Sequence, residues 1–251
     1  PSKFVVSRYL VLEFLLHAEN PKLIALNKSA TMPLTISPGG GQRGLVAFPL
    51  AGNGKRSIDV LFPVLHGPFG EDGTVQGLLK LLIDVPFVGS GVLGSALGMD
   101  KDVAKRLFRD AGIPTAKFVA CQISARMPDF DEVKKMLGLP FFVKPANLGS
   151  SVGVHKVKSK SEFTKALKDA FQYDTKIIIE EFIRGREIEC AVLGNDAPAA
   201  SLPGEVIVRH EFYSYEAKYI DTQGAKLEIP AKLPGDVVEK VQQMALRAFK
   251  V

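Results

Sequence analysis

The alternation of apolar and polar residues becomes regular from residue 58 onward. A continuous apolar run of strand length covers 58–65, an amphipathic helix is predicted over 74–83, and a short strand follows at 86–88. A strand, a helix and a second strand in this order favour a parallel α/β layer. The preceding residues are less regular and include a Pro/Gly-rich stretch at 35–44.

A second unit follows a linker region and a helix predicted over 100–111, which Gly112 and Pro114 end. Its helices and its strands, which are able to pair antiparallel, indicate an α+β unit. A final helix over 236–250 runs almost to the last residue, and because a domain rarely ends inside a helix we expect the sequence to be incomplete. The elements between these helices are strand 117–122, helix 129–137, strand 140–144, a glycine loop, strand 154–157, helix 160–171 with Ser159 or Ser161 as its cap, strand 176–182 and strand 187–193.

The amino-acid composition argues against a helical membrane protein and against a nucleic-acid-binding protein. The 251 residues fit one large domain or two smaller ones, and no run of about 18 apolar residues predicts a membrane helix. The 32 Lys and Arg residues outnumber the 27 Asp and Glu residues but are scattered, which favours anionic ligands over a nucleic-acid surface. Cys121 and Cys190 belong to no CxxC pair, so we expect buried free thiols in a reducing cytoplasm rather than a disulfide.

The segment 141–153 has the composition of a phosphate-binding loop. Lys144 stands at the end of a strand and supplies a flexible point charge suited to phosphate. Gly149 and Gly153 carry no Cβ, so the backbone there can approach an anion and adopt positive φ. Ser150 and Ser151 add hydroxyl donors. An ordinary hairpin turn is the alternative interpretation of this segment alone.

Two adjacent acidic residues follow the isoleucine-rich strand at 176–182. Because neighbouring side chains on a strand face opposite ways, Glu180 and Glu181 cannot both share the apolar face, and one is expected to enter a cleft. Such a carboxylate accepts hydrogen bonds from an amino group or sugar hydroxyls, while the backbone of Phe182 and Ile183 could contact a purine edge. The alternative is a solvent-exposed strand end.

Other candidate features are weaker when each is taken alone. His66 precedes a glycine at a predicted strand end, where open α/β sheets bind ligands, but it could be a structural turn histidine. Lys101 lies at the start of a helix between two units, yet most helical lysines are solvated. The aromatic segment 212–219 could be a packed strand pair. The GxGxxG match at 89–94 requires a strand that ends in an acidic residue about 20 residues later, but a helix is predicted there, so we discount a dinucleotide site.

Five motifs occur in order along the chain: HGPFGEDG at 66–73, MDK at 99–101, VKPANLGSSVG at 143–153, GREIEC at 185–190 and FYSYEAKY at 212–219. Together they resemble the D-alanine–D-alanine ligase family of the ATP-grasp superfamily, over about residues 58–251. The resemblance implies an N-terminal parallel α/β domain (1–98), a central α+β nucleotide-binding domain (99–185) and an incomplete C-terminal domain (186–251).

The family pattern also implies a role for individual residues. Ser150 and Tyr219 resemble a hydrogen-bonded pair that orients the first substrate and the closing loop, and we expect both to be catalytic. His66, Tyr213 and Tyr219 are expected to contact substrate, and Tyr219 favours a dipeptide product over a D-lactate ester. The expected ATP-binding residues are Lys101, Lys144, Ser150, Ser151, Glu180, Glu181, Phe182, Ile183, Glu187, Phe212 and Lys218.

The implied reaction joins two D-alanine molecules with ATP for peptidoglycan precursor synthesis. The γ-phosphoryl group is transferred to one D-alanine carboxylate, and the amine of the second attacks the resulting acyl phosphate. Two Mg²⁺ ions are expected to neutralise the crowded oxygens. The resemblance further implies a cytoplasmic homodimer that binds ATP and D-alanine, with no nucleic-acid or membrane partner.

The sequence departs from the family pattern at both ends. No N-terminal glycine-rich segment with an acidic residue and a serine precedes residue 58, and the family's Asp, Glu and Asn metal ligands would follow Val251. We therefore expect these 251 residues to be inactive alone or to belong to a longer protein. Another ATP-grasp carboxylate–amine ligase and a non-catalytic nucleotide-binding fragment remain as alternative functions.

Overall fold

The structure is a computed structural model that describes residues 34–36, 45–47, 56–57, 60–82, 86–208 and 225–251. The chain divides into two compact units, Pro1–Ala96 and Leu97–Val251, which are described separately. The further division expected between residues 185 and 186 stays a prediction.

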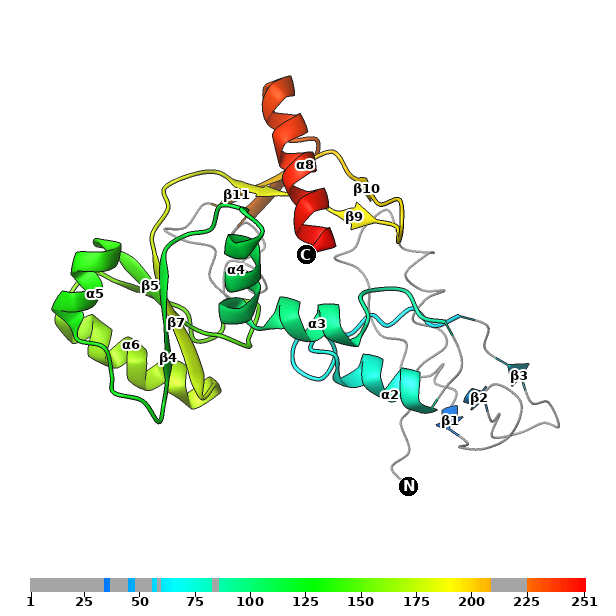
Figure 1. Ribbon diagram of the computed structural model, residues 1–251, viewed down its shortest axis with the longest axis horizontal. Coiled ribbons are helices and arrows are strands. Elements are labelled where there is room, and N and C mark those ends of the chain that lie inside the picture. Colours follow the sequence, from blue (N-terminus) through cyan, green and yellow to red (C-terminus); the bar gives the residue numbers. More distant parts are fainter. Residues whose placement is uncertain (1–33, 37–44, 48–55, 58–59, 83–85, 209–224) are drawn as a thin grey trace. The chain divides into compact units, whose positions relative to one another are not determined.

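The first unit contains a small antiparallel sheet followed by helices (Figure 1). Strands β1 (Leu34–Ile36), β2 (Leu45–Ala47) and β3 (Arg56–Ser57) pair in that order. Helix α2 (Thr74–Leu82) confirms the helix predicted over 74–83. Helix α3 (Val92–Met99) follows, where the sequence had predicted a linker. Gly94 and Gly98 lower its intrinsic helix propensity, which is why the pattern did not indicate it.

The two strands predicted around α2 were wrong in extent. In the described part of 58–65 and 86–88, the pairing is a single parallel bridge between Leu61 and Phe87. Leu61 N donates to Pro86 O at 2.9 Å, and Val88 N donates to Leu61 O at 2.8 Å. Pro63 has no N–H to donate, so a ladder cannot continue regularly through that position. The parallel direction of the bridge agrees with the predicted strand direction.

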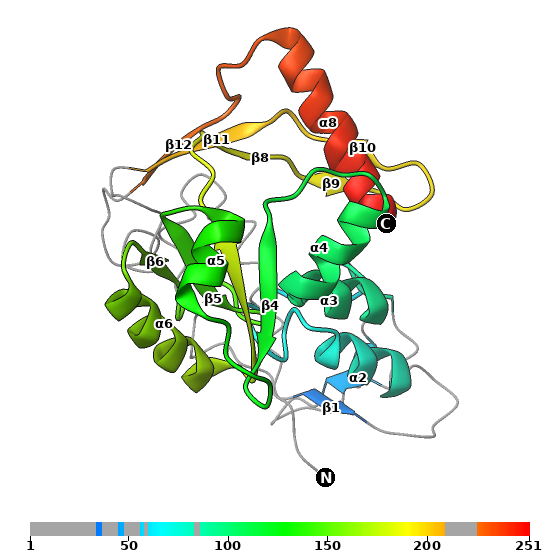
Figure 2. The ribbon, with the colours of Figure 1, turned by 60° about the vertical axis from the view of Figure 1, so that its left-hand side comes forward.

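The second unit is built on a four-stranded antiparallel sheet with the order β4-β7-β5-β6. Its strands are β4 (Phe118–Gln122), β5 (Phe141–Pro145), β6 (His155–Val157) and β7 (Lys176–Glu181), close to the predicted bounds. Helices α4 (Lys101–Asp110), α5 (Phe130–Leu137) and α6 (Lys160–Tyr173) were also predicted (Figure 2). This antiparallel sheet with its helices confirms the expected α+β architecture.

Side-chain caps fix the start of each of these helices. Asp100 caps α4 through Asp102 N and Val103 N, and Asp129 caps α5 in the same way. Of the two serines predicted as possible caps of α6, Ser159 and Ser161, the cap is Ser159, whose Oγ accepts from Glu162 N at 3.4 Å.

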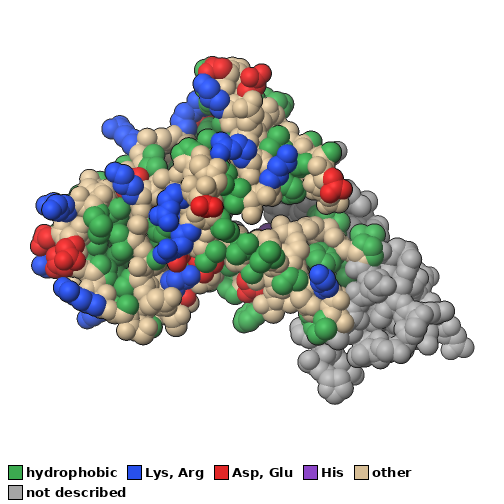
Figure 3. Space-filling model, in the orientation of Figure 1, with side chains coloured by type: hydrophobic (Ala, Val, Ile, Leu, Met, Phe, Trp, Pro, Cys, Tyr) green, Lys and Arg blue, Asp and Glu red, His purple; other side chains and the backbone are tan. Residues whose placement is uncertain are grey.

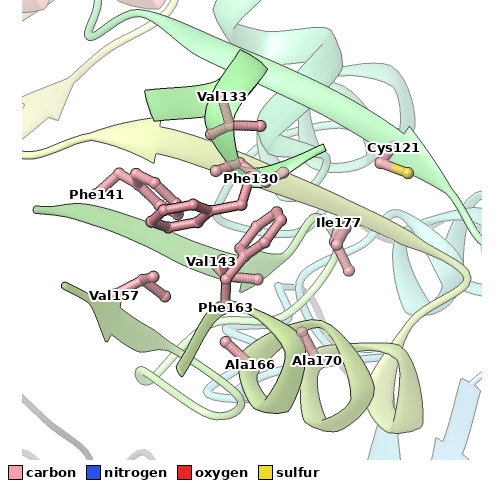
Figure 4. Close-up of a cluster of buried hydrophobic side chains, with 11 residues drawn as sticks. Cys121, Phe130, Val133, Phe141, Val143, Val157, Phe163, Ala166, Ala170 and Ile177 are labelled. Carbon is pink, nitrogen blue, oxygen red and sulfur yellow. The ribbon is translucent and has the colours of Figure 1, made fainter. Parts of the chain in front are cut away.

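One face of the sheet forms the hydrophobic core with α5 and α6 (Figure 4). Alternation along β5 buries Phe141 and Val143, and alternation along β7 directs Ile177 and Ile179 into the same cluster. Phe141 meets the ring of Phe163 edge to face, with centroids 5.5 Å apart. The residues between them in sequence therefore face the opposite side of the sheet.

The rest of the second unit contains a smaller sheet, a hairpin and a long helix. Strand β11 (Gly204–Val208) lies between β12 (Ala225–Glu228) and β8 (Glu187–Glu189). The single strand predicted over 187–193 is broken, because β9 (Val192–Leu193) leaves β8 and pairs with β10 (Ala199–Ala200). Helix α8 (Gly235–Lys250) lies beside this hairpin (Figure 2).

Among the residues that the structure describes, no helix combines the length and apolar character needed to cross a membrane.

Truncating a buried core side chain should lower the free energy of unfolding far more than truncating an exposed one. Phe141→Ala removes a ring with 0% exposure and should lower the free energy of unfolding by about 3–5 kcal/mol. Met136→Ala, at a helical position that is 53% exposed, should change it by less than about 1 kcal/mol. Urea denaturation of both variants checks this, and similar midpoints for the two would contradict the assigned core.

Candidate functional site

The face of the sheet opposite the core carries a cluster of charged residues. In the β5–β7 ladder Phe142 pairs with Glu180 and Lys144 pairs with Ile178, so Lys144 and Glu180 occupy diagonal positions on one face. Their side chains form an ion pair between Lys144 Nζ and Glu180 Oε2. Lys105 of α4 approaches from the side and places its Nζ 2.5 Å from Glu180 Oε1. One carboxylate is thus held between two ammonium groups.

The ion pairs determine the protonation of Glu180. Burial alone would raise the pKa of this carboxyl, but the charges and hydrogen bonds of Lys144 and Lys105 outweigh burial and hold the pKa below its ordinary value. The side chains of Glu180 and Lys105 are each 14% exposed and that of Lys144 is 20% exposed. Glu180 is therefore an anion in a partly desolvated setting, where its hydrogen bonds are strong.

Lys101 adds a third ammonium group beside this cluster. Burial, followed by the charge of Lys144, lowers its pKa to about 8. Its Nζ donates to the carbonyl oxygens of Ala146, at 3.2 Å, and Leu148. Its backbone N also donates to Ala146 O, at 3.0 Å. Lys101 therefore contacts the segment that follows β5 through both its backbone and its side chain.

Helix α4 is fixed to the sheet near its N-terminus, which positions Lys101 and Lys105. Lys176 at the start of β7 forms an ion pair with the cap residue Asp100, and its Nζ lies 3.6 Å from Asp102 Oδ2. Asp102 also accepts from Arg106 Nε at 2.6 Å. A shift of α4 relative to β7 would separate these partly buried ion pairs and leave charges uncompensated. The ion pairs therefore fix the position of α4 on the sheet.

Aromatic rings flank the carboxylate on both neighbouring strands. Glu180 pairs with Phe118 on one side and Phe142 on the other. The ring of Phe182 lies 6.0 Å from that of Phe142, and Lys156 Nζ lies 4.4 Å from the Phe182 centroid. Apolar ring surface around a single hydrogen-bond acceptor suits a planar heterocycle that carries an amino group.

Residues 147–153 form the serine loop between β5 and β6. Positive φ was expected at its glycines, and Gly153 adopts it, with φ 65°. Gly149 does not. Instead Ser150 and Ser151 have φ values of 55° and 60°, a left-handed conformation that costs a non-glycine residue about 1–2 kcal/mol each. Strained residues of this kind cluster at ligand-binding sites, which supports the phosphate-loop interpretation over an ordinary hairpin turn.

The remaining predicted residues are distributed differently. Glu181 is turned toward β4, where its Oε1 accepts from Lys117 N at 2.7 Å. Ile183 is 64% exposed. Glu187 lies on β8 of the smaller sheet. His66 lies in the first unit, just before a turn in which Glu71 Oε2 accepts from Gly67 N at 2.5 Å. The predicted residues Phe212, Tyr213, Lys218 and Tyr219 lie outside the described residues.

Sequence reasoning missed Lys105, although its spacing from Lys101 places both on one face of α4. The two lysines therefore reach the cluster from the same helix, one at the serine loop and one at Glu180.

Acidic residues are not gathered into a metal site in the described part of the chain. Within that part, no group of three or more His, Cys, Asp or Glu side chains is arranged to hold a metal ion. Basic side chains are spread over the visible face and interspersed with acidic ones, rather than forming one continuous patch (Figure 3). Both cysteines are free, but only Cys121 is buried as expected, whereas Cys190 is partly exposed.

Comparisons with known proteins agree with the motifs. Residues 16–90 match the family model of the D-ala D-ala ligase N-terminus, and residues 107–251 match that of the D-ala D-ala ligase C-terminus. The chain is 53% identical to a D-alanine–D-alanine ligase of Oceanobacillus iheyensis over 241 residues, covering 94% of this chain and 64% of the relative. It is 48% identical to D-alanine–D-alanine ligase A of Escherichia coli K12 over 240 residues, covering 94% of this chain and 65% of the relative.

Two solved structures have the same fold. The D-alanine–D-alanine ligase from Coxiella burnetii superposes with a TM-score of 0.74 at 38% identity, over 94% of this chain and 61% of that one. The VanG D-Ala:D-Ser ligase from Enterococcus faecalis gives 0.76 at 35% identity, over 89% and 64%. The chain thus spans less than two thirds of the length of these relatives. It has the ATP-grasp fold and belongs to the D-alanine–D-alanine ligase family.

Proposed function

We propose that the protein containing this chain is an ATP-dependent ligase that joins two D-alanine molecules into D-alanyl-D-alanine for peptidoglycan synthesis. The observation that carries this proposal is the Glu180 carboxylate between Lys144 and Lys105, with Lys101 and the serine loop beside it, in a chain of this family. Three ammonium groups carry more positive charge than the Glu180 carboxylate neutralises, and such a cluster can bind a triphosphate.

The described residues fit ATP by their chemistry. Glu180, flanked by Phe118 and Phe142, would accept from the adenine amino group while the rings pack against the base. Lys144 would contact the phosphates together with Lys101. In the structure Lys101 donates to carbonyl oxygens of the Ala146–Leu148 segment, so it would exchange these acceptors for phosphate oxygens when the nucleotide binds.

Other nucleotide contacts complete the proposal. The backbone around Glu181, Phe182 and Ile183 would meet the adenine, and Glu187 would hold the ribose. Phe212 would pack near the base and Lys218 would reach the phosphates.

The proposed reaction has two steps. A D-alanine carboxylate oxygen attacks the γ-phosphorus, the bond to ADP breaks, and an acyl phosphate forms. The amine of a second D-alanine then attacks the acyl carbon, and phosphate leaves with the bonding electron pair. The positive charges of Lys101 and Lys144 stabilise the oxygens on which negative charge develops.

Residues beyond the charged cluster have proposed substrate roles. Ser150 and Tyr219 would orient the first D-alanine and the serine loop. His66 and Tyr213 would line the substrate subsites. Phosphoryl transfer by this family implies Mg²⁺, but the described residues include no suitable group of carboxylates, so we assign it no ligands here.

The enzyme is further proposed to act in the cytoplasm as a homodimer. Free Cys121 and Cys190 and the use of ATP favour the cytoplasm. A homodimer remains part of the proposal on the strength of the family resemblance.

Product formation tests the proposal directly. The full natural polypeptide that carries this chain should release ADP from Mg-ATP only when D-alanine is present, and mass spectrometry should identify D-alanyl-D-alanine. Lys144→Ala should lower kcat/KM by about 100-fold, because a phosphate contact that stabilises the transition state is lost. Lys168→Ala, at an exposed position of α6, is the matched control and should retain activity. Turnover that ignores D-alanine would refute the ligase assignment.

The lowered pKa of Lys101 predicts a pH dependence of nucleotide binding. At pH 7, below this pKa, the free ammonium is mostly protonated and binds phosphate as a cation. As the pH rises from 7 to 9.5 the group loses its proton, so the Kd for ADP should increase by about tenfold. Lys101→Arg keeps its charge over this range and should show a flatter profile, even at lower affinity. Isothermal titration calorimetry checks this, and parallel profiles for the two proteins would contradict it.

A further inference from the structure

Two consecutive residues at the C-terminal end of α6 contact both ends of the serine loop. Tyr173 is the last residue of α6, and Asp174 is its C-cap. Neither residue was singled out from the sequence, and neither belongs to the proposed nucleotide contacts. Both lie next to a loop that carries two serines in a left-handed backbone conformation.

Asp174 ties the beginning of the serine loop to the sheet and to α6. Its Oδ2 accepts from the backbone N of Asn147 at 2.7 Å and from Asn147 Nδ2 at 3.0 Å. Its Oδ1 accepts from Lys176 N at 3.0 Å, and its own backbone N donates to Ala170 O at 3.3 Å. One carboxylate thus joins the end of α6, the start of β7 and the first residue of the loop.

Tyr173 contacts the other end of the loop. A Cβ placed on Gly153 would lie 2.7 Å from Tyr173 Cδ2 and 3.0 Å from Pro145 Cγ. The backbone of Gly153 therefore packs directly against the tyrosine ring and the end of β5. Because Gly153 also has a φ of 65°, two independent constraints require glycine at this position.

These two contacts differ in kind from the contact made by Lys101. Lys101 donates to the carbonyl oxygens of Ala146 and Leu148, and it is the residue that would turn to phosphate. Asp174 and Tyr173 have no such second partner in the proposed reaction. Their contacts with Asn147 and Gly153 can therefore persist while Lys101 changes acceptors.

We propose that Asp174 and Tyr173 are positioning residues that hold the two ends of the serine loop, so that Ser150 and Ser151 reach the transferred phosphoryl group in a fixed geometry. The expected effect on ATP turnover rests on the proposed ligase function. The expected hold on the serine loop does not. The energetic reason is that left-handed serines revert to ordinary backbone conformations unless both ends of the loop are held.

The carboxylate at position 174 is essential to this proposal. It offers acceptors to three N–H groups at once. An asparagine of the same shape has only one oxygen and would direct an NH₂ group at one set of these donors. Asp174→Asn is therefore a sharp variant, because it keeps the volume of the side chain and removes one acceptor.

The first test measures the loop without nucleotide. Backbone amide hydrogen exchange over residues 147–153 should accelerate at least tenfold in Asp174→Asn and Tyr173→Ala. The control is Asp129→Ala, which removes a carboxylate that accepts from Asp131 N at 2.8 Å and Glu132 N at 3.4 Å at the cap of α5. Exchange in the serine loop should be unchanged in this control. Unchanged exchange in the two test variants would overturn the proposal.

The second test uses steady-state kinetics of the full natural polypeptide. Asp174→Asn should raise the KM for ATP several-fold and lower kcat by about tenfold, with the KM for D-alanine unchanged. A role in general stability alone would reduce the active fraction and leave every KM unchanged, and that result would overturn the positioning role. If the wild-type protein shows no D-alanine-dependent turnover, the ligase proposal fails, while hydrogen exchange still decides whether Asp174 and Tyr173 hold the loop.

A pair of glycine variants tests the contact with Tyr173 separately. Gly153→Ala and Gly138→Ala both place a Cβ at a positive φ, 65° and 76° respectively. Nothing lies within 4 Å of a Cβ at Gly138, whereas a Cβ at Gly153 meets the tyrosine ring. Only Gly153→Ala should accelerate exchange in the serine loop. Because the positive φ adds strain there as well, the part due to the ring is the acceleration that disappears when Gly153→Ala is combined with Tyr173→Ala. Acceleration there in both variants, or in neither, would contradict the proposed contact.

Discussion

The arrangement of the charged cluster depends on a single carboxylate that compensates several ammonium groups. Lys105 and Lys144 both contact Glu180, and Lys101 lies close enough to Lys144 for the repulsion to contribute to its lowered pKa. Without an anion at this point, burial and mutual repulsion would drive lysines out of the cluster or neutralise them. Glu180 therefore determines how closely α4 and β5 can bring Lys105 and Lys144 together.

Local patterns in the sequence were sufficient to predict most helices and strands of the second unit. The helices α4, α5 and α6 were predicted from apolar periodicity and end signals, and a serine cap was predicted for α6. Alternation along β7 predicted that either Glu180 or Glu181 would leave the apolar face, and the structure shows that it is Glu180. The antiparallel register then placed Lys144 next to it, which the sequence could not specify. Lys105 and Asp174 were missed because their importance comes from contacts made across 75 and 27 positions of the chain.

The errors also have physical causes. The apolar run at 58–65 resembled a strand, but pairing beyond Leu61 would need a partner of matching length and an N–H at Pro63. Positive φ was expected at Gly149 and Gly153, where glycine removes the steric cost; Gly153 has it, but Gly149 does not, and Ser150 and Ser151 adopt it as well. The strand expected over 187–193 divides because its two halves pair with different strands, β11 and β10. Each error concerns a tertiary contact that overrides a local preference.

The alternation along β7 has a consequence for which changes the chain can tolerate during evolution. Ile177 and Ile179 belong to the core, while Glu180 belongs to the charged cluster on the other face. Inserting or deleting one residue inside this strand would shift the following side chains to the other face, so the Glu180 carboxylate would point to the core face and would no longer meet Lys144 and Lys105. Length variation in this part of the family should therefore be confined to the connections between strands, and β7 should diverge by substitution only.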